Sequence, residues 1–334
     1  LPINKKISLF SLVFFLDLYY TRFMKTYEKI YQILSKNNNF ISGETMANQL
    51  NISRTAIWKG IKTLEELGLE IESVTNKGYR LVSGDILLPE QLEQEIGIKV
   101  SLNNNSASTQ LDAKMGIESK LKTPHLFLAP NQKKAKGRFD RPFFTSNQGG
   151  IYMSLLLQPN VPIEDIKPYT VMVASSAVKA ISRLTGITPE IKWVNDIYLD
   201  NKKIAGILTE AIASVESGLV TNVIIGLGIN FYIKEFPRAL TKRAGSLFTE
   251  QPTITRNQLI TEIWNLFFNI PLEDHLKVYR EKSLVLDRTV SFMDGQTMYS
   301  GKAIDITDKG YLVVELDDGQ LKTLRSGEIS LSSW

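Results

Sequence analysis

The sequence predicts an α+β protein of several domains, and three features of its pattern lead to this prediction. Residues 24–84 show amphipathic helices followed by a hairpin, residues 85–285 mix buried strands with apolar helices, and residues 286–334 show short strands between turns. A chain of 334 residues is long enough for two or three domains. We therefore expect a small helical domain, a larger mixed α/β domain and a small β-domain.

The composition excludes several kinds of site. The chain is 43% hydrophobic and 22% charged, as globular proteins usually are, and its formal net charge is only +4, so a nucleic-acid surface must be local. The absence of cysteine excludes disulfides, thiolate metal sites and a thiol nucleophile. His125 and His275 are the only histidines, which excludes a histidine-rich metal site, and neither is assigned a role.

Residues 1–23 differ in character from the rest of the chain. Lys5 and Lys6 precede an apolar run of about 14 residues, which is interrupted by Asp17 and is shorter than the ~18 residues of a membrane-spanning helix. No small-residue cleavage site comes after this run, and Met24 stands just before the first domain pattern. We expect this extension to be a mis-assigned translation start, with a weak membrane anchor as the alternative.

The pattern from residue 24 to residue 84 predicts a winged helix-turn-helix domain. Ser42 and Ser53 precede the second and third helical runs, where serine is a preferred N-cap, and Gly68 ends the third. A turn-rich stretch at residues 75–78 separates two short strands. The helices and strands are expected, in order, at residues 27–34, 42–50, 54–67, 71–74 and 79–82.

The third helix of this domain is the expected DNA-reading element. Its apolar positions fall on one face, namely Ile57, Ile61, Leu64 and Leu67. Recognition helices meet base edges and phosphates near their start. We therefore expect DNA contacts from Ser53, Arg54, Thr55, Trp58, Lys59 and Lys62. The modest charge predicts a dimer on two half-sites, and a small helical module used only for dimerisation is the alternative.

The central region, residues 85–285, alternates between strands and helices. Residues 84–102 are expected to be a linker with an entry helix at residues 89–96. An apolar helix at residues 169–186 is expected to pack behind a sheet. Buried strands are expected at residues 125–129, 149–157 and 223–230, with a hairpin between residues 192 and 210.

Residues 132–141 form a basic loop. No hydrophobic period runs through them, Gly137 allows the backbone to approach a ligand closely, and cations neutralise phosphate charge. The stretch therefore predicts a loop that closes over an anion, with a solvated basic loop as the alternative. Its basic residues are Lys133, Lys134, Lys136, Arg138 and Arg141.

Two further polar clusters accompany this loop. One lies on the expected hairpin, where Asn195, Asp196, Lys202 and Lys203 punctuate two apolar runs. The other is a compact triplet of donors and acceptors just before a helix, which indicates either a ligand site or an N-cap: Ser108, Thr109 and Gln110.

Together these stretches resemble the biotin–protein ligases. That family has a glycine- and arginine-rich loop, a Lys-Trp-Pro-Asn-Asp strand and a Lys-x-x-Gly-Ile-Leu-x-Glu strand, which match residues 132–141, 192–196 and 203–210. The segments Ser53–Lys59 and Asn76–Leu81 resemble the repressor-type members, which regulate biotin genes. The resemblance covers nearly the whole chain from about Met24 onward.

The sequence departs from the family pattern in a few places. Ala135 and Lys136 stand where the family usually has Gly and Arg, and Val194 stands where it has Pro. An acidic residue that the family usually has near Asn131 is absent. The charge of the loop is kept, although lysine is a point charge where arginine is a planar fork.

The resemblance implies a class II synthetase-like ligase domain at residues 85–285 and an SH3-like β-barrel at residues 286–334. Turns at Asp-Gly and Asp-Lys-Gly sequences separate the strands of the expected β-barrel. These strands are expected at residues 289–292, 299–306, 311–316 and 320–324, followed by the family's closing motif at residues 326–331.

The resemblance also implies an activity. Biotin is activated with ATP and Mg²⁺ to biotinyl-5′-AMP, and the biotinyl group passes to a lysine of the biotin carrier domains of carboxylases. Lys203 and Arg138 are the implied catalytic residues, and Asp196 is the implied guide for Mg²⁺ on the phosphates. Biotin contacts are implied for Ser108, Thr109, Gln110, Gln132, Lys136, Gly137, Arg138 and Lys203. Nucleotide contacts are implied for Lys136, Arg138, Asn195 and Asn230.

The implied partners extend beyond the substrates. They are operator DNA of biotin genes and a second copy of the chain when the adenylate is bound, in the cytoplasm and without a membrane. One alternative is a lipoyl or octanoyl transferase-like enzyme, which lacks the N-terminal DNA module. Another is a ligand-sensing transcription regulator without ligase activity, against which the retention of Lys203, Arg138 and Asn195–Asp196 argues.

Overall fold

The computed structural model describes residues 24–146 and 148–331. The chain divides into two compact units, with the boundary between Gln91 and Leu92 inside helix α5, Pro89–Ile96. The expectations about residues 1–23 fall outside the described part of the chain. Within that part, no helix combines the length and the apolar character needed to cross a membrane.

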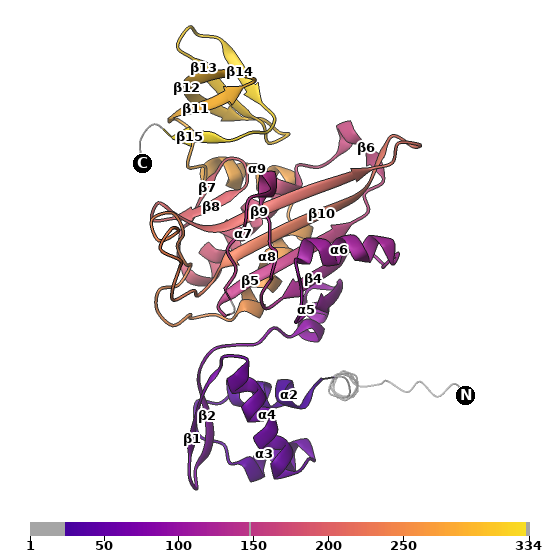
Figure 1. The fold of residues 1–334 in the computed structure, drawn as a ribbon, viewed down its shortest axis with the longest axis vertical. Coiled ribbons are helices and arrows are strands. Elements are labelled where there is room, and N and C mark those ends of the chain that lie inside the picture. The colour runs from indigo at the N-terminus through magenta and orange to yellow at the C-terminus, as the bar shows by residue number, and fades with distance from the viewer. Residues whose placement is uncertain (1–23, 147, 332–334) are drawn as a thin grey trace, which may run out of the picture. The chain divides into compact units, whose positions relative to one another are not determined.

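Among its described residues, the N-terminal unit contains three helices and one antiparallel strand pair ahead of α5 (Figure 1). Ser42 Oγ accepts the Thr45 N–H at 3.0 Å, and Ser53 Oγ accepts the Ala56 N–H at 3.1 Å, so both serines are the predicted N-caps. The predicted helices and hairpin are confirmed, with these bounds: α2 Thr26–Ser35, α3 Gly43–Leu50, α4 Arg54–Glu66, β1 Glu70–Val74 and β2 Gly78–Ser83.

The core of this unit corrects one expectation about α4. Ile57, Ile61 and Leu64 are buried as predicted, but Leu67 is 42% exposed. The helix ends at Glu66, with Leu67 as its C-cap, and Gly68 then takes a positive φ of 92° that turns the chain. Leu69 enters the core after this turn. The helical period predicts Leu67 on the buried face, but the helix ends one residue before Leu67.

The C-terminal unit is built on one mixed sheet with the strand order β3-β4-β5-β10-β9-β8-β7, in which β6 also pairs with β10. The long antiparallel pair of β9 and β10 forms its middle and is joined to β5 on one side and β8 on the other. The bounds are β3 Lys99–Leu102, β4 His125–Ala129, β5 Gly150–Leu157, β6 Val161–Pro162, β7 Glu190–Lys192, β8 Asp196–Leu199, β9 Lys202–Ala213 and β10 Leu219–Asn230.

Strands β6 and β3 of this sheet were not expected. Lys99–Leu102 lies in the stretch predicted to be linker and helix, but it pairs in parallel with His125–Leu128 of β4. Four residues are too few for an alternating pattern to stand out from a linker. The predicted entry helix is confirmed as α5. The strand predicted at residues 125–129 is confirmed with the same ends, and those predicted at residues 149–157 and 223–230 are confirmed with shifted ends.

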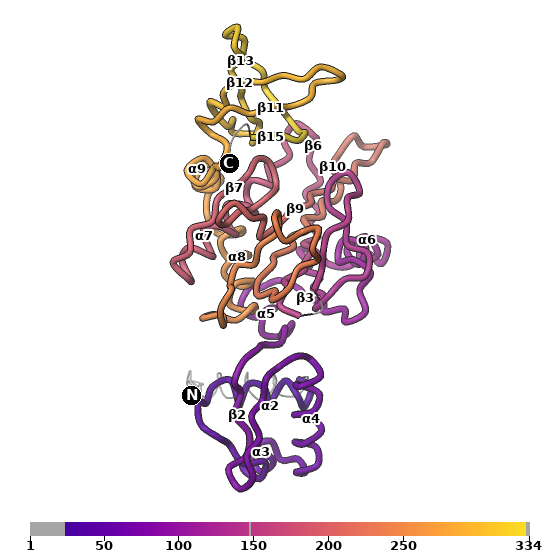
Figure 2. The backbone as a smooth tube through the Cα atoms, turned by 60° about the vertical axis from the view of Figure 1, so that its left-hand side comes forward, coloured from indigo at the N-terminus to yellow at the C-terminus, as the bar shows by residue number. Residues whose placement is uncertain are grey.

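Helices cover both faces of this sheet. Helix α6, Thr109–Glu118, packs on β4, β5 and β10, while α7, Tyr169–Thr185, packs on β9 from the other side, as Figures 1 and 2 show together. The predicted apolar helix behind the sheet is therefore confirmed. It packs in turn on α8, Arg256–Asn269, and α9, Leu272–Glu281, neither of which the sequence analysis identified.

The last strands form a separate five-stranded antiparallel sheet in the order β14-β13-β12-β11-β15. Trp193 Nε1 donates to the Gly310 carbonyl oxygen at 2.9 Å, which ties this sheet to the central one within the same unit. Strand β15 was expected only as a motif and not as a strand. The bounds are β11 Thr289–Asp294, β12 Thr297–Ile306, β13 Leu312–Leu316, β14 Leu321–Leu324 and β15 Ile329–Leu331.

Candidate active site

An open cleft of about 910 Å³ lies on the central sheet, where β5, β9 and β10 run side by side. The start of α6 and the basic loop line it, together with residues 236–244 and residues 327–330. Residues from segments far apart in the sequence therefore meet here. They include every residue with an implied biotin, nucleotide or metal contact: Ser108, Thr109, Gln110, Gln132, Lys136, Gly137, Arg138, Asn195, Asp196, Lys203 and Asn230.

The polar triplet forms the start of α6. Ser108 is the N-cap, and its Oγ accepts the Gln110 N–H at 3.3 Å, so the N-cap interpretation is confirmed for this residue. The Thr109 N–H donates to Gln132 Oε1 at 2.7 Å. Gln132, the first residue of the basic loop, thus connects this loop to the first turn of the helix. The Ser108 hydroxyl can still donate its own proton to a ligand.

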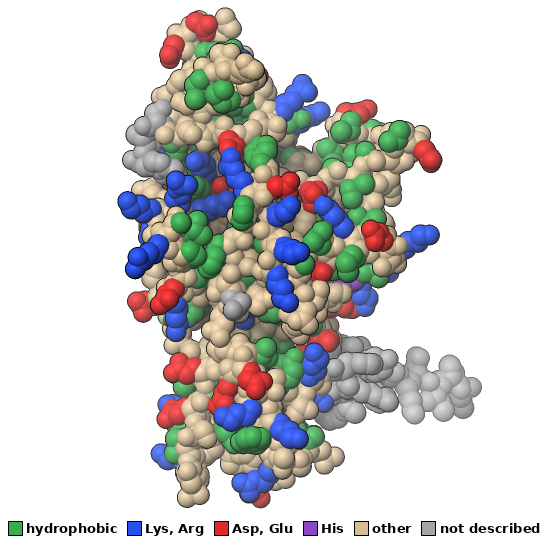
Figure 3. All heavy atoms as spheres, viewed as in Figure 1, with side chains coloured by type: hydrophobic (Ala, Val, Ile, Leu, Met, Phe, Trp, Pro, Cys, Tyr) green, Lys and Arg blue, Asp and Glu red, His purple; other side chains and the backbone are tan. Residues whose placement is uncertain are grey.

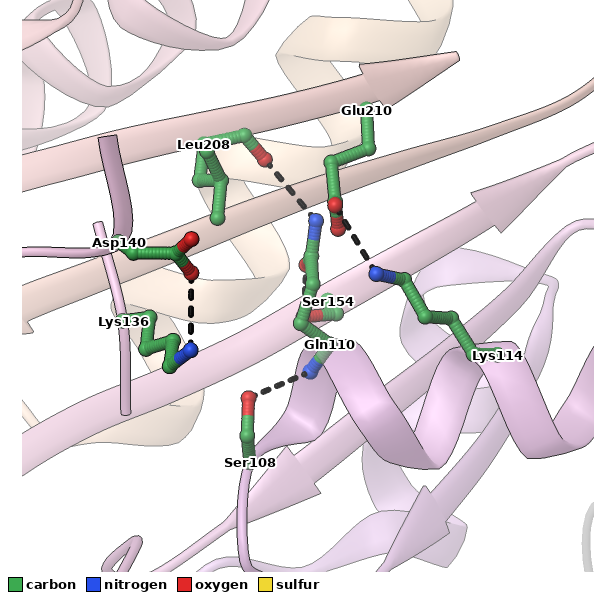
Figure 4. Close-up of polar contacts among 8 residues, drawn as sticks. All are labelled: Ser108, Gln110, Lys114, Lys136, Asp140, Ser154, Leu208 and Glu210. Atoms are coloured by element: carbon green, nitrogen blue, oxygen red, sulfur yellow. Dashed lines mark hydrogen bonds and ion pairs between the residues drawn. The ribbon is translucent and has the colours of Figure 1, made fainter. Parts of the chain in front are cut away.

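The Gln110 side chain is buried against two strands (Figure 4). Its Oε1 accepts the Ser154 hydroxyl of β5 at 2.9 Å, and its Nε2 donates to the Leu208 carbonyl oxygen of β9 at 3.3 Å. Gly226 of β10 leaves room for it, because a Cβ there would lie 2.7 Å from Gln110 Oε1. The strands therefore hold the amide in one orientation, and Ser154 also bonds Thr109 Oγ1 at 2.9 Å.

Lys203, near the start of β9, forms an ion pair with Asp196 of β8. Its Nζ lies 2.6 Å from Asp196 Oδ1, and both side chains are about one quarter to one third exposed, at 32% and 25%. Lys192 of β7 lies opposite Asp196 in the register of the β7–β8 strand pair and also lines the cleft. Burial lowers the pKa of Lys192, and nearby Lys203 lowers it further, while the carboxylate of Asp196 opposes both.

Arg138 connects the basic loop to the hairpin and to the C-terminal sheet. Its guanidinium donates to Asn195 Oδ1 at 3.2 Å and to the Gly327 carbonyl oxygen at 3.0 Å. The Asn195 side chain in turn donates to the Ile207 carbonyl oxygen at 2.9 Å. The predicted cation and the predicted amide are therefore in direct contact.

The other loop positions have different surroundings. Lys136 Nζ pairs with Asp140 at 2.8 Å and is 60% exposed, so this pair has to open before Lys136 can meet a ligand (Figure 4). The exposed Asp140 carboxyl has a lowered pKa because it bonds Lys136. Gly137 has an extended backbone, and a Cβ there would meet only the Arg141 carbonyl oxygen, at 3.8 Å. Within the described chain there is room for a side chain at Gly137.

Asn230 ends β10 beside Lys203. Its Nδ2 donates to the Gly245 carbonyl oxygen at 2.9 Å and to that of Lys203 at 3.5 Å. Its Oδ1 is buried and has no hydrogen-bond partner among the described residues. A buried amide oxygen without a partner is costly, so a donor from a ligand would stabilise it.

Phe143 was missed by the sequence analysis. Gly206 and Gly228 face each other across β9 and β10, and a Cβ at Gly228 would lie 2.7 Å from the Phe143 ring. The glycine pair therefore makes the hollow in which the ring lies. Paired glycines on neighbouring strands are a signal in the sequence, but the sequence does not say which aromatic residue fills the space.

The contact between the basic loop and the C-terminal sheet was also missed. Both terminal guanidinium nitrogens of Arg141, Nη1 and Nη2, donate to the Glu328 carboxylate, with Nη2 at 2.8 Å from Oε2. Parallel hydrogen bonds of this kind fix the direction of both side chains. Arg141 and Glu328 are 187 positions apart in the chain, so no local pattern could have indicated the pair.

The cleft is strongly basic. Its lining contains seven Lys or Arg residues but only Asp196 and Glu328 as acids, which suits an anionic ligand. Figure 3 shows Lys and Arg side chains gathered on the surface over the central sheet. Lys242 and Arg243, from the loop after β10, belong to this set and were not among the predicted residues. The basic members are Lys136, Arg138, Arg141, Lys192, Lys203, Lys242 and Arg243.

No protein-only metal cage is present in the described part of the chain. Those residues contain no group of three or more His, Asp or Glu side chains that could hold a metal ion. Asp196 is one of the two carboxylates in the cleft lining, and its Oδ1 is buried without a hydrogen-bond partner apart from the ion pair with Lys203. A single carboxylate fits Mg²⁺ that is held mainly by substrate phosphates and water.

The N-terminal unit carries a second candidate surface on α4. Arg54, Thr55, Trp58 and Lys59 are exposed, as the expected DNA contacts require. Lys62 is exposed as well, but its Nζ pairs with Glu65 at 2.6 Å. Ser53 is occupied as the N-cap, so its side chain serves the helix first.

Three family models match the chain. Residues 27–80 match the HTH domain model, residues 104–230 match the Biotin/lipoate A/B protein ligase family, and residues 285–332 match the Biotin protein ligase C terminal domain. Together these matches span both units and the last sheet.

Known relatives match over most of the chain. A protein named Bifunctional ligase/repressor BirA from Bacillus subtilis (strain 168) is 32% identical over 312 residues, covering 88% of this chain and 94% of the relative. The protein of the same name from Escherichia coli (strain K12) is 28% identical, covering 90% and 95%. Among solved structures, the biotin protein ligase from Aquifex aeolicus in complex with biotin and ATP is 25% identical with a TM-score of 0.57, covering 70% of this chain and 97% of that one.

Proposed function

The chain belongs to the family of bifunctional biotin ligase/repressors, and on this premise we propose how its two units perform the two activities. The enzyme is an ATP-dependent biotin–protein ligase, and the helix-turn-helix unit serves repression of biotin genes. The observation that carries the ligase proposal is the cleft, which brings the polar triplet, the basic loop and Lys203 together on one sheet. The roles of single residues are our proposals.

Biotin binds at the start of α6. The ureido ring of biotin has N–H donors and a carbonyl acceptor, which suit the hydroxyls of Ser108 and Thr109. Gln110 is occupied by Ser154 and Leu208, so it holds the strand-facing side of the site in place. Gln132 couples this end of the cleft to the basic loop through its bond with the Thr109 N–H.

In the first step a carboxylate oxygen of biotin forms a bond with the α-phosphorus of ATP, and the bond to pyrophosphate breaks. Arg138 exchanges the Gly327 carbonyl oxygen for a phosphate oxygen, and Lys203 exchanges Asp196 for the biotinyl carboxylate. Both cations neutralise charge that moves between oxygens during the step. Lys136 contributes after its pair with Asp140 opens, and Asn195 and Asn230 contact the nucleotide.

In the second step the amine of an acceptor lysine attacks the acyl carbon of the adenylate. A new amide bond forms, the bond from that carbon to the phosphate oxygen breaks, and AMP leaves as the amine loses a proton. The carrier domain of a carboxylase supplies the lysine. No enzyme nucleophile is needed, which agrees with a chain that has no cysteine. Catalysis then rests on position and charge.

Mg²⁺ fits this cleft as a companion of ATP. Asp196 is the residue that would guide it, and when bound the ion neutralises phosphate charge.

The two sheets of the C-terminal unit belong to different folds in our proposal. We assign the central sheet with its helices to the class II synthetase-like ligase fold and the five-stranded terminal sheet to an SH3-like barrel.

The N-terminal unit binds operator DNA with α4 as the recognition helix and the β1–β2 hairpin as the wing. A monomer with three cations on this helix has little charge for tight binding, so we propose a homodimer on two half-sites, favoured by the bound adenylate. We propose the cytoplasm as its location, because operator DNA and carboxylase carrier domains are both reached there.

The decisive experiment combines the full chain with biotin, ATP, Mg²⁺ and a biotin carrier domain, followed by streptavidin detection. We expect label on the carrier lysine only when ATP is present. Lipoate in place of biotin is the matched arm, read from the mass of the carrier because streptavidin does not bind lipoate, and transfer of lipoate alone would replace this proposal by the transferase alternative. Absence of transfer to a competent carrier in both arms would leave a sensor.

A further inference from the structure

Helix α4 presents a continuous outer stripe. Its buried side is formed by Ile57, Ile61 and Leu64, each at most 1% exposed. The exposed positions repeat at the helical spacing i, i+3, i+4 and i+7, which places them on one face. These residues are Thr55, Trp58, Lys59 and Lys62.

Trp58 is the apolar member of this stripe. It is 52% exposed, and the structure gives its indole no hydrogen bond and no ring contact with any of the described residues. Its neighbours on the stripe are a hydroxyl and two ammonium groups. An exposed indole among cations suits a partner whose outer edge carries negative charge and whose inner surface offers an apolar group to the ring.

Duplex DNA has this character. Arg54 and Lys59 supply positive charge beside Trp58, Lys62 adds to it when its ion pair with Glu65 opens, and α4 has no acidic residue in its first turn. The N-terminal end of a helix adds a partial positive charge. The cations of this stripe therefore match phosphates along the edges of the major groove, and Trp58 between them is left to meet the bases.

From this arrangement, and resting on the DNA-binding role proposed above, we propose that Trp58 reads a thymine in each operator half-site. Thymine presents a C5-methyl group and the O4 acceptor in the major groove. Indole offers an apolar ring and one N–H donor but no acceptor. The amino groups of adenine and cytosine would stay unpaired against it, and guanine has acceptors but no methyl group. Thymine alone satisfies both parts of the side chain.

The test starts by selecting sites from a pool of random duplexes with the full chain, biotin and MgATP. Each thymine of the selected site is then replaced by deoxyuridine, which lacks only the methyl group. For one thymine per half-site, we expect the replacement to weaken binding by about fourfold, the value of one buried methyl-sized group. With Trp58→Ala, the thymine and deoxyuridine sites should bind equally.

Two variants keep this result specific. Trp58→Phe retains a ring and is expected to keep the preference for thymine. Leu67→Ala changes an exposed apolar residue at the far end of the same helix and is expected to behave as the wild type does. Thermal unfolding checks that each variant is folded. An equal deoxyuridine penalty in Trp58→Ala and wild type would overturn the assignment and leave DNA binding intact. Failure to select any site would overturn both.

Discussion

Lys203 lies 2.6 Å from Asp196 in the cleft, with 32% of its side chain exposed. Because we propose that its charge neutralises the reacting carboxylate of biotin, we expect Lys203→Ala to lower the rate of adenylate formation by roughly 10²–10³. Arg138→Ala should cost a similar factor through the phosphate. The measurement is pyrophosphate release with biotin and ATP. Lys202→Ala, the exposed neighbour outside the cleft, is the matched control and should retain the wild-type rate.

An unchanged rate in both cleft variants would refute the roles given to these cations. Loss of rate in the Lys202→Ala control would point instead to the stability of the β8–β9 hairpin.

His275 is buried, and its Nδ1 lies 2.7 Å from Ser175 Oγ between α9 and α7. Burial lowers the pKa of His275 from 6.5 to about 4. The unfolded chain therefore binds a proton between pH 6.5 and pH 4 that the folded chain does not, so stability is full above pH 6.5 and falls as the pH drops through this window. The loss at pH 5 is expected to be about 2 kcal/mol.

The check compares melting temperatures at pH 7.5 and pH 5 for wild type and His275→Gln. Glutamine does not titrate, so the fall should be smaller in the variant by roughly 4–8 °C. The pKa of His125 is also lowered by burial, but His125 is present in both proteins and cancels in the difference. Equal falls would show that His275 does not carry this effect.

Strands β9 and β10 provide the floor of the cleft through the facing glycines Gly206 and Gly228. In Gly228→Ala the new Cβ would lie 2.7 Å from the Phe143 ring, so the ring has to move within the cleft. We expect weaker binding of ATP or biotin with little change in folding. Isothermal titration with ATP and with biotin in separate experiments shows which ligand binds more weakly.

Gly137→Ala is the comparison for this substitution, because the described chain leaves room for a Cβ there. The folded protein should be equally stable. Any loss of ligand affinity in Gly137→Ala would then report close approach of a ligand to the loop backbone. Normal binding by Gly228→Ala would show that Phe143 moves freely.

Helix α4 is expected to act on DNA independently of ligation. The Lys59 side chain is exposed and makes no hydrogen bond or ion pair with the described residues, so Lys59→Ala should weaken binding to all sequences and reduce the slope of log K against log salt by about 1. Arg54→Ala should behave in the same way. Biotin transfer to a carrier should be normal in both variants. Gel shifts at several salt concentrations provide the measurement, and an unchanged slope would remove the residue from the phosphate contacts.

The whole molecule joins a ligand-binding unit to a DNA-binding unit. We expect the adenylate to carry negative charge into a cleft whose charged lining residues are mostly cations, which would relieve their mutual repulsion and stabilise the loop of residues 132–141. If this favours the dimer, biotin with ATP should tighten operator binding by about 5- to 150-fold, the usual range for coupled sites. Gel shifts with and without both ligands provide the measurement.

Lys203→Ala serves as the control for this coupling, because it should bind operator at the basal affinity and show little tightening with biotin and ATP. Identical affinities with and without the ligands in the wild type would show that the two units share a chain without coupling.

Several parts of the site could be predicted because their signals are local. The charge of residues 132–141, the triplet at Ser108 and the Lys203 strand each stand out within a few positions. Phe143 and Glu328 could not be predicted, because their roles come from contacts with segments far away in the chain. Helices α8 and α9 were missed although α8 contains a run of buried apolar residues.

The sequence by itself determined many of the elements and which family the chain resembles, since caps, hydrophobic period and short motifs act through neighbours along the chain. It did not determine that β3 joins the sheet or that Leu67 is exposed to solvent. Nor did it determine that Lys136 pairs with Asp140 and that Arg138 donates to the Gly327 carbonyl oxygen. Those outcomes depend on strand pairing and on charge partners brought together by folding. Only the tertiary structure decides them, because the interaction energies involved exist only once distant segments are in contact.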